Sequence, residues 1–312
     1  MGILVDIITP VFGLVVMGYV AARLRWFEEA GIKGLSGFVF NFAIPVMLFR
    51  TIATTTLPQE MPWQFLASYY VSGLFLFAFA MLLGRMVFHQ ETQAVGIYGM
   101  AGSYSNVVLL GIPLVLTTFG DRASLPLFMI VATQAAVMFV ATTAVIESAA
   151  GAGGQLRHLP WQTALVLARN PIIIGLLLGL FFNLLQIAIP APIDTLAKSL
   201  GGAALPCAVF SVGASLSQYR VQGSLSEACS LAALKNLLHP LLVWIMAHHL
   251  FQLDAIWTAT AVLLAGAPVG VNVYLFAQRY NALVAPAAAA IVISTGTSII
   301  TLSVILYLLD VR

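Results

Sequence analysis

Apolar stretches of about 20 residues recur along the whole chain and are separated by short polar connections. Each stretch is about as long as a helix that crosses the hydrocarbon core of a bilayer. The alternation of apolar and polar residues that a membrane barrel strand needs is absent, and backbone groups in lipid must otherwise bond within their own helix. The pattern predicts an all-α polytopic membrane protein with ten transmembrane helices, at about residues 3–22, 34–54, 63–86, 92–118, 123–147, 163–186, 194–217, 226–250, 255–279 and 285–309.

A glycine-rich connection at residues 148–155 divides these spans into two sets of five. The helix-breaking residues of the two sets match at a constant offset of 161 residues, pairing Pro10 with Pro171, Gly18 with Gly179 and Pro45 with Pro206. Two consecutive units with an odd number of helices enter the membrane from opposite sides. We therefore predict two inverted five-helix repeats, residues 1–150 and 151–312, an architecture typical of alternating-access transporters.

Composition agrees with a membrane protein, because 61% of the 312 residues are hydrophobic and 8% are charged, against about 25% charged in soluble domains. The net charge of +2 is small and its basic residues are scattered, which gives no indication of nucleic acid as a partner. Cys207 and Cys229 provide no disulfide framework or metal site. Known catalytic motifs are also absent, so we expect neither an enzyme nor a cofactor.

The distribution of Lys and Arg predicts the orientation in the membrane, because cytoplasmic loops are enriched in these residues. The larger group falls on the side of the connection between the repeats: Arg23, Arg25, Lys33, Arg85, Arg157, Arg169, Arg220 and Arg279. The smaller group falls on the side of the termini: Arg50, Arg122, Lys198 and Arg312. We therefore expect both termini on the outer side.

The fourth and ninth spans contain matched interruptions. In the fourth span, GSYSNVVLLGIPLV carries Ser103, Tyr104, Ser105, Asn106, Gly111 and Pro113; in the ninth, AGAPVGVNVYLF carries Gly266, Pro268, Gly270 and Asn272. Glycine and proline open a helix within the membrane. Two half-broken helices can then cross, with the N-termini of their second halves converging, and such N-termini favour an anion.

Asn106 and Asn272 are the leading candidates for substrate contact, because an amide offers both donors and an acceptor. Ser103, Ser105 and Tyr104 are weaker candidates. All five side chains could instead cap the helix breaks or bond between helices, as small polar residues commonly do in membrane bundles.

Two further groups stand out. Pro45 and Pro206 interrupt the second and seventh spans and could either flank the crossing or only kink their helices. In the eighth span, Lys235 and His239 lie four residues apart within LKNLLHPLLVW, where ionisable groups are costly. The lysine could replace a coupling cation, titrate or attract an anion, or it could extend to the interface; the histidine could simply bond an opened carbonyl. With Asn41, one turn before Pro45, these two are the candidates for ion coupling or charge compensation.

Four segments in order, FAIPVMLF, SNVVLLGIPL, LKNLLHPLLVW and APVGVNVYLFAQRY, resemble the auxin efflux carrier family over nearly the whole chain. The resemblance implies crossing fourth and ninth helices, a scaffold, a moving transport unit and a fold similar to bile acid:sodium symporters. It also implies that Asn106 and Asn272 match substrate-binding asparagines of the plant carriers, and that Lys235 matches a lysine that works with an acidic residue of the third helix. That acid is missing here, since no Asp or Glu lies between Trp63 and Gln90.

The short connection between the repeats resembles that of bacterial members, which implies the inner membrane. We predict a secondary transporter of a small organic anion, such as malonate, malate or an auxin-like acid. The alternatives are a sodium-coupled symporter of a bulkier amphipathic anion and, from a different class, a channel or receptor-like sensor. The expected partners are the organic anion and membrane lipid; the coupling ion (H⁺ or Na⁺), the direction of transport and a homodimer are left open.

Overall fold

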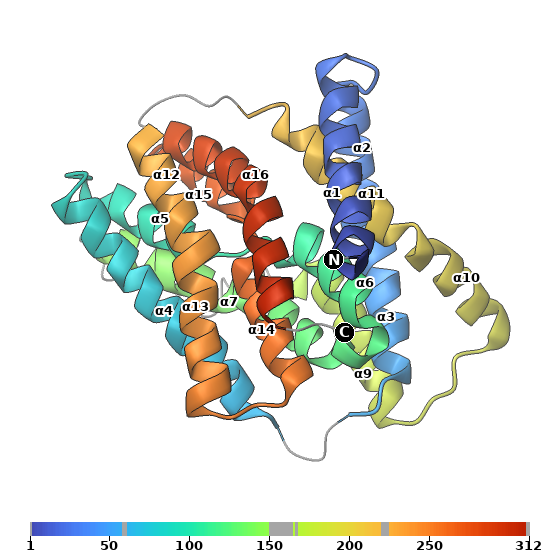
Figure 1. The fold of residues 1–312 in the computed structure, drawn as a ribbon. Helices are drawn as coiled ribbons and strands as arrows, with labels where there is room; N and C mark the ends of the chain where they lie inside the picture. Colours follow the sequence, from blue (N-terminus) through green and yellow to red (C-terminus); the bar gives the residue numbers. More distant parts are fainter. Residues whose placement is uncertain (1, 58–60, 150–164, 166–167, 220–224, 310–312) are drawn as a thin grey trace. The chain divides into compact units, whose positions relative to one another are not determined.

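A computed structural model describes residues 2–57, 61–149, 165, 168–219 and 225–309, and Figure 1 shows their arrangement. Within these residues the structure contains helices and no strand, and an isolated β-bridge joins Ser105 to Val269. The all-α prediction is therefore confirmed for this part of the chain. Most of the glycine-rich connection lies outside the described residues, as do Arg157, Arg220 and Arg312.

The α-helices are α1 (Gly2–Arg23), α2 (Glu29–Phe38), α3 (Ile44–Thr54), α4 (Trp63–Met86), α5 (Thr92–Ser103), α6 (Ile112–Phe119), α7 (Ser124–Ala149), α9 (Pro171–Leu184), α10 (Ala191–Gly202), α11 (Ala204–Leu216), α12 (Leu225–Ala233), α13 (His239–Trp244), α14 (Ala255–Gly266), α15 (Asn272–Arg279) and α16 (Val284–Leu308). Six continuous helical stretches are long and apolar enough to cross a membrane: Glu29–Thr54, Trp63–Met86, Val107–Ser148, Ala191–Leu216, Leu225–Leu250 and Val284–Leu308. Shorter apolar helices cover Ile8–Arg23, Pro171–Leu184 and Ala255–Gly266. The count of ten spans and the inverted repeat stay predictions.

Proline shapes several of the long helices. Widened π-helical turns at Val39–Ala43, Val107–Gly111 and Leu234–Leu238 are each followed, two residues later, by a proline: Pro45, Pro113 and Pro240. Proline lacks the N–H of a regular helical bond and its ring clashes with the carbonyl four residues earlier. A π turn absorbs this clash without ending the helix, and such turns are frequent at functional sites.

The chain forms two compact units, and each takes segments from both halves of the sequence. The first unit contains Met1–Met61, Val108–Ala132 and Leu165–Gln218; the second contains Pro62–Val107, Thr133–Ala164 and Tyr219–Arg312. The units therefore cut across the proposed repeats, because helices are exchanged between the halves.

The first unit is built on two pairs of closely packed helices, α1 with α11 and α3 with α9. A Cβ atom added at Gly18 of α1 would lie 2.1 Å from the Phe210 carbonyl oxygen of α11, and one added at Gly179 of α9 would lie 2.6 Å from the Phe49 carbonyl oxygen of α3. Small residues allow such backbone approach in membrane bundles. Gly18 and Gly179 are one of the pairs matched at an offset of 161 residues, so both predicted repeats use the same glycine to pack against a helix of the other half.

A substitution on α1 tests this packing. We expect Gly18→Val to lower the melting temperature strongly, because the new side chain must push α11 away, and overpacking typically costs about 1–3 kcal/mol. The matched control is Gly13→Val on the same helix, where an added Cβ meets nothing within 4 Å. Melting of both purified variants in detergent measures the difference; equal melting temperatures would show that the contact does not constrain the fold.

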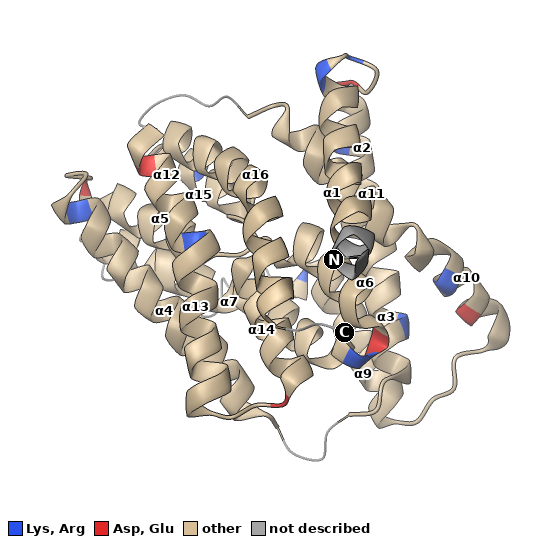
Figure 2. Cartoon of the chain, viewed as in Figure 1, with Lys and Arg blue, Asp and Glu red and all other residues tan. Residues whose placement is uncertain are grey.

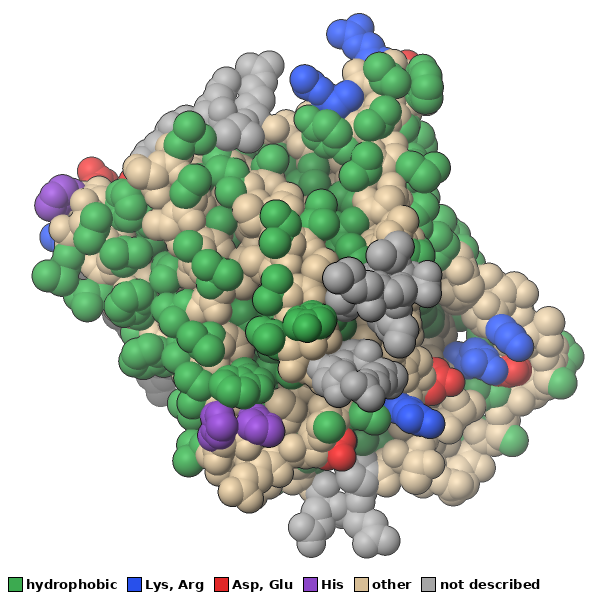
Figure 3. Space-filling model, in the orientation of Figure 1, with side chains coloured by type: hydrophobic (Ala, Val, Ile, Leu, Met, Phe, Trp, Pro, Cys, Tyr) green, Lys and Arg blue, Asp and Glu red, His purple; other side chains and the backbone are tan. Residues whose placement is uncertain are grey.

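The second unit contains α4, α5, α12 to α16 and the later part of α7. The large side chains Phe75 and Leu82 of α4 are 59% and 55% exposed, which suits a surface in contact with lipid. Figure 2 shows the few charged residues mainly at helix ends and in connections, and Figure 3 shows hydrophobic side chains over most of the visible face.

Candidate anion site in the second unit

Two non-helical segments meet in the second unit. Helix α5 ends at Ser103 and α14 ends at Gly266, and the segments that follow, residues 104–106 and 267–271, pair like short antiparallel strands. The Asn106 N–H donates to the Pro268 carbonyl at 2.8 Å, and the Gly270 N–H donates to the Tyr104 carbonyl at 3.0 Å. These bonds satisfy backbone groups that lipid could not. We call residues 104–106 and 267–271 the crossing.

Glycine is needed at one position of the crossing. A Cβ atom added at Gly270 would lie 2.4 Å from the Tyr104 ring and 3.2 Å from the Ser105 carbonyl oxygen. The absence of a side chain therefore lets the two segments approach closely enough to form their hydrogen bonds. Pro268, whose carbonyl accepts from Asn106, supplies no N–H that would need a partner.

The predicted polar side chains gather at the crossing. Asn272 begins α15, and its Nδ2 donates to the Tyr104 hydroxyl at 2.7 Å. Asn106 lies immediately before the next helical turn and is 7% exposed, whereas Asn272 is half-buried. The Ser103 hydroxyl donates to the Gly99 carbonyl, as a serine within a helix commonly does. The geometry thus bonds Asn272 to Tyr104 and places Asn106 in the crossing, but turns Ser103 toward its own helix.

Ser105 belongs to a network that the sequence pattern did not reveal. The Tyr69 hydroxyl donates to Gln134 Oε1 at 2.6 Å and lies 3.2 Å from Ser105 Oγ, while Gln134 Nε2 donates to the Ser105 carbonyl at 2.8 Å. On the other segment, the Ser294 hydroxyl accepts the Val269 N–H at 3.0 Å. Gln134 in α7 could have been noticed as a lone amide in an apolar run, but its partners lie far away in the sequence.

Lys235 lies in the π turn before α13 and is completely buried. Its Nζ donates to the carbonyl of Ala265, in the last turn of α14 just before the crossing. The last carbonyls of a helix lack intrahelical partners and carry the negative end of its dipole, so a cation is stabilised there. The interpretation that Lys235 extends to the membrane surface is wrong for this structure, since its amine is bonded inside the unit.

His239, the first residue of α13, is also completely buried. Neither ring nitrogen has a hydrogen-bond partner among the described residues, so the imidazole does not bond an opened carbonyl there. Its ring lies against the Tyr69 ring, with centroids 5.5 Å apart. Buried polar atoms without partners are rare in proteins and indicate a functional role or a missing water or ion.

Comparison with known proteins agrees with this architecture. A family model described as "Membrane transport protein" matches residues 3–306, nearly the whole chain. The chain belongs to this family. It contains the auxin efflux carriers, as the resemblance of the sequence motifs predicted, so the protein is an integral membrane transporter.

Three relatives match over most of this transporter. A Rhizobium meliloti (strain 1021) protein named "Putative malonate transporter" is 28% identical over 307 residues, covering 97% of this chain and 95% of the relative. The Arabidopsis thaliana "Auxin efflux carrier component 8" is 25% identical over 327 residues, covering 87% of this chain and 88% of the relative. The mouse "Lysosomal cholesterol signaling protein" is 25% identical over 310 residues, covering 92% of this chain but 35% of that longer protein.

Several predicted site residues of this transporter lie in the first unit and not at the crossing: Gly111, Pro113, Pro45, Pro206 and Asn41. Gly111 ends a π turn and Pro113 lies in the first turn of α6, so neither residue makes the helix break, which occurs at residues 104–106. Asn41 is exposed, and its Nδ2 donates to the Gly37 carbonyl at 2.9 Å.

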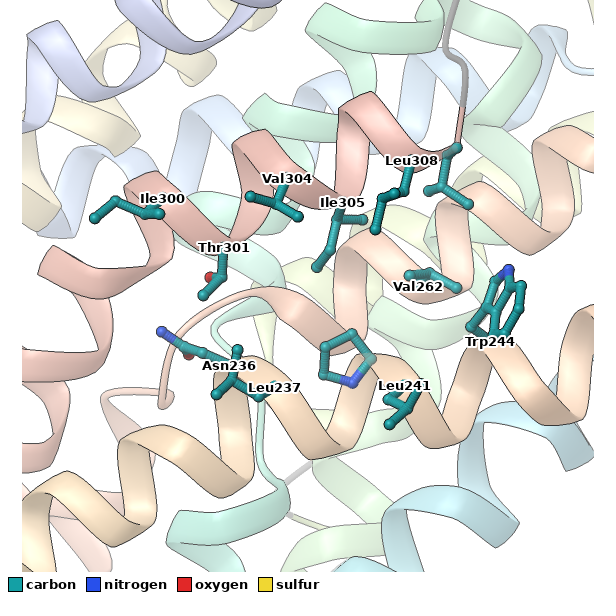
Figure 4. A pocket seen from close by; sticks show the side chains of 12 residues that line it. Asn236, Leu237, Leu241, Trp244, Val262, Ile300, Thr301, Val304, Ile305 and Leu308 are labelled. Carbon is teal, nitrogen blue, oxygen red and sulfur yellow. The ribbon is translucent and has the colours of Figure 1, made fainter.

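A cavity of about 600 Å³ opens between α13, α14 and α16 in the second unit. Figure 4 shows Asn236 and Thr301 at one end of this pocket and Trp244 at the other. The pocket contains no charged side chain, and Asn236 Nδ2 is already bonded to the Ser294 carbonyl at 2.7 Å. Its lining suits an apolar group, so it is a poorer anion site than the crossing.

Proposed function

We propose that this protein is a secondary transporter of a small organic carboxylate, with malonate as the first candidate substrate. The observation that supports the proposal is the crossing, which contains Asn106 in one segment and is followed directly by Asn272 after the other. The buried Lys235 bonds to the Ala265 carbonyl just before the crossing. The N-terminus of α15, which begins at Asn272, offers the positive end of its helix dipole to an anion. The name of the Rhizobium meliloti relative supports malonate in particular.

The mechanism that we propose is alternating access. The second unit holds the crossing, and we assign it the role of the moving transport unit, with the first unit as the scaffold. The bias of Lys and Arg supports a cytoplasmic connection between the repeats and termini on the outer face of a bacterial inner membrane. Inverted repeats would supply two equivalent end states.

Lys235 would act in this mechanism as a tethered cation. Its ammonium occupies the C-terminal end of α14, where other transporters could hold a metal cation, and its charge would balance the carboxylate. Among the described residues of the unit no acid matches it, because the carboxylates Glu91, Glu147, Glu227 and Asp254 lie at or near helix ends. One buried positive charge without a partner acid favours an anionic substrate.

A thermal-shift screen followed by uptake tests the proposal. Millimolar malonate should raise the melting temperature of the purified protein, because a ligand that binds the folded state stabilises it, whereas an uncharged ester of malonate should not. Labelled malonate should accumulate in proteoliposomes, and Asn106→Ala should lower uptake at least about tenfold, the loss of ~1.4 kcal/mol that one useful polar contact represents. If no mono- or dicarboxylate stabilises the protein, the proposed substrate class is wrong. Binding without uptake would favour a sensor.

A further inference from the structure

Two basic side chains are buried in the described part of the second unit, Lys235 and His239, and the proposed substrate site involves only Lys235. Lys235 is bonded to the α14 carbonyl, whereas both nitrogens of His239 lie without a partner among the described residues. An imidazole has at least one N–H donor in either protonation state, so burying its ring nitrogens without hydrogen-bond partners costs folding free energy. A structural histidine would be expected to bond at least one neighbour.

The side chains around His239 do not fix the charge of its imidazole ring. Gly73 of α4 faces it: a Cβ added there would lie 3.6 Å from His239 Nε2. The Tyr69 ring covers the imidazole from the same helix, and an aromatic face stabilises an adjacent cation. The helix that faces the histidine thus presents a glycine and an aromatic ring in place of a carboxylate.

The titratable and charged groups on α4, α14 and the two π turns that flank α13 surround His239. They are Tyr69, Tyr70 and, at the helix end, Arg85 from α4; none from α14; Lys235 from the preceding π turn; and His248 and His249 from the following turn. Lys235 acts electrostatically on His239 from four residues away. No carboxylate on these elements compensates a second positive charge, so a proton on His239 is opposed by the lysine unless an anion is present.

The geometry points to a proton-coupled mechanism: we propose that His239 takes up one proton when the carboxylate binds at the crossing, so that substrate and proton are transported together. This inference rests on the proposed function and names its coupling ion. The carboxylate supplies a negative charge that α4, α14 and the turns beside α13 do not, which allows Lys235 and His239 to be charged at once. The proton that enters offsets one of the two negative charges of malonate.

A ring contact followed by hydrogen bonds connects the histidine to the crossing. The Tyr69 ring contacts His239, and the Tyr69 hydroxyl reaches both Ser105 and Gln134, which in turn holds the Ser105 backbone carbonyl. A charge placed on His239 therefore acts on the side chain that positions one of the two crossing segments. Through Tyr69, protonation of His239 can thus affect the proposed substrate site.

Calorimetry measures the proton directly. Malonate binding to the detergent-solubilised protein would be titrated in two buffers with different ionisation enthalpies, at a pH at which free malonate carries both charges. The buffer dependence should correspond to about one proton taken up per malonate by the wild-type protein, and to almost none for His239→Gln. The matched control His248→Gln, at the end of the same span, should retain the wild-type proton number.

Each outcome has a defined meaning. Wild-type binding with no proton uptake would overturn the coupling and leave the proposed substrate intact, and this test needs no variant. Proton uptake unchanged in a folded His239→Gln protein would move the proton to another group and refute the assignment; His239→Asn provides a second variant if the first melts early. Absence of malonate binding in the wild-type protein would reject the proposed substrate and the coupling together.

Discussion

Lys235→Met should reduce malonate uptake in proteoliposomes by about 100-fold or more. Methionine keeps an unbranched apolar stem but removes the ammonium that bonds the Ala265 carbonyl beside the crossing. The unpaired carbonyl costs about 1–3 kcal/mol of folding stability with or without substrate, whereas the lost counter-charge weakens binding of the anion itself. A binding loss of ~2.7 kcal/mol corresponds to a factor of about 100.

The control for this variant is Lys198→Met, which removes an exposed lysine of α10 in the first unit and should leave uptake unchanged. Uptake by the wild-type protein should also persist when sodium is replaced by potassium, because the lysine already occupies the end of α14. Near wild-type uptake by a folded Lys235→Met protein would refute the role of the tethered cation. Strict dependence on sodium would instead favour the alternative of a sodium-coupled symporter.

Asn272→Asp should weaken malonate binding by about 100-fold while leaving the protein folded. The two side chains have nearly the same shape, but aspartate adds a negative charge at the first residue of α15. A negative charge at a helix N-terminus favours the helix by about 0.3–1 kcal/mol, so the substitution should not unfold the protein. The same charge repels an anion; at an effective dielectric constant of ~20 this repulsion is several kcal/mol at contact distance.

The matched control is Asn281→Asp, which adds the same charge at an exposed turn of the second unit. Binding is measured by titration calorimetry and folding by the melting temperature. Unchanged affinity in Asn272→Asp would exclude Asn272 from the anion site. If this variant binds a cation more tightly than the wild type binds malonate, the proposal that the substrate is an anion is wrong.

Much of the helical fold was predictable because the bilayer imposes one simple rule: apolar stretches long enough to cross it must be helical. The positions of the helix breaks were harder to predict. Prolines and glycines indicated interruptions near the right places, and Pro268 and Gly270 do lie in one of them. Pro113 instead follows a π turn, which absorbed its clash, so the break of the fourth span lies several residues earlier than its proline suggests.

The organisation into compact units could not be predicted from the two halves of the sequence. Contacts such as that of Gly18 with α11 join segments almost 200 residues apart, and no local pattern reveals which helix will meet which. The same limit applies to the site. Lys235 was conspicuous as a charge in an apolar run, but its bond to Ala265 and the network of Tyr69 with Gln134 depend on tertiary packing alone.

The central claim is that the crossing in the second unit binds a carboxylate. Selenodiacetate, a dicarboxylate that carries an anomalously scattering selenium atom, would first be shown by thermal shift to stabilise the protein and then be soaked into crystals. An anomalous difference peak is expected within contact distance of Asn106 and Asn272. A peak only in the apolar pocket beside Trp244, or only in the first unit, would contradict it.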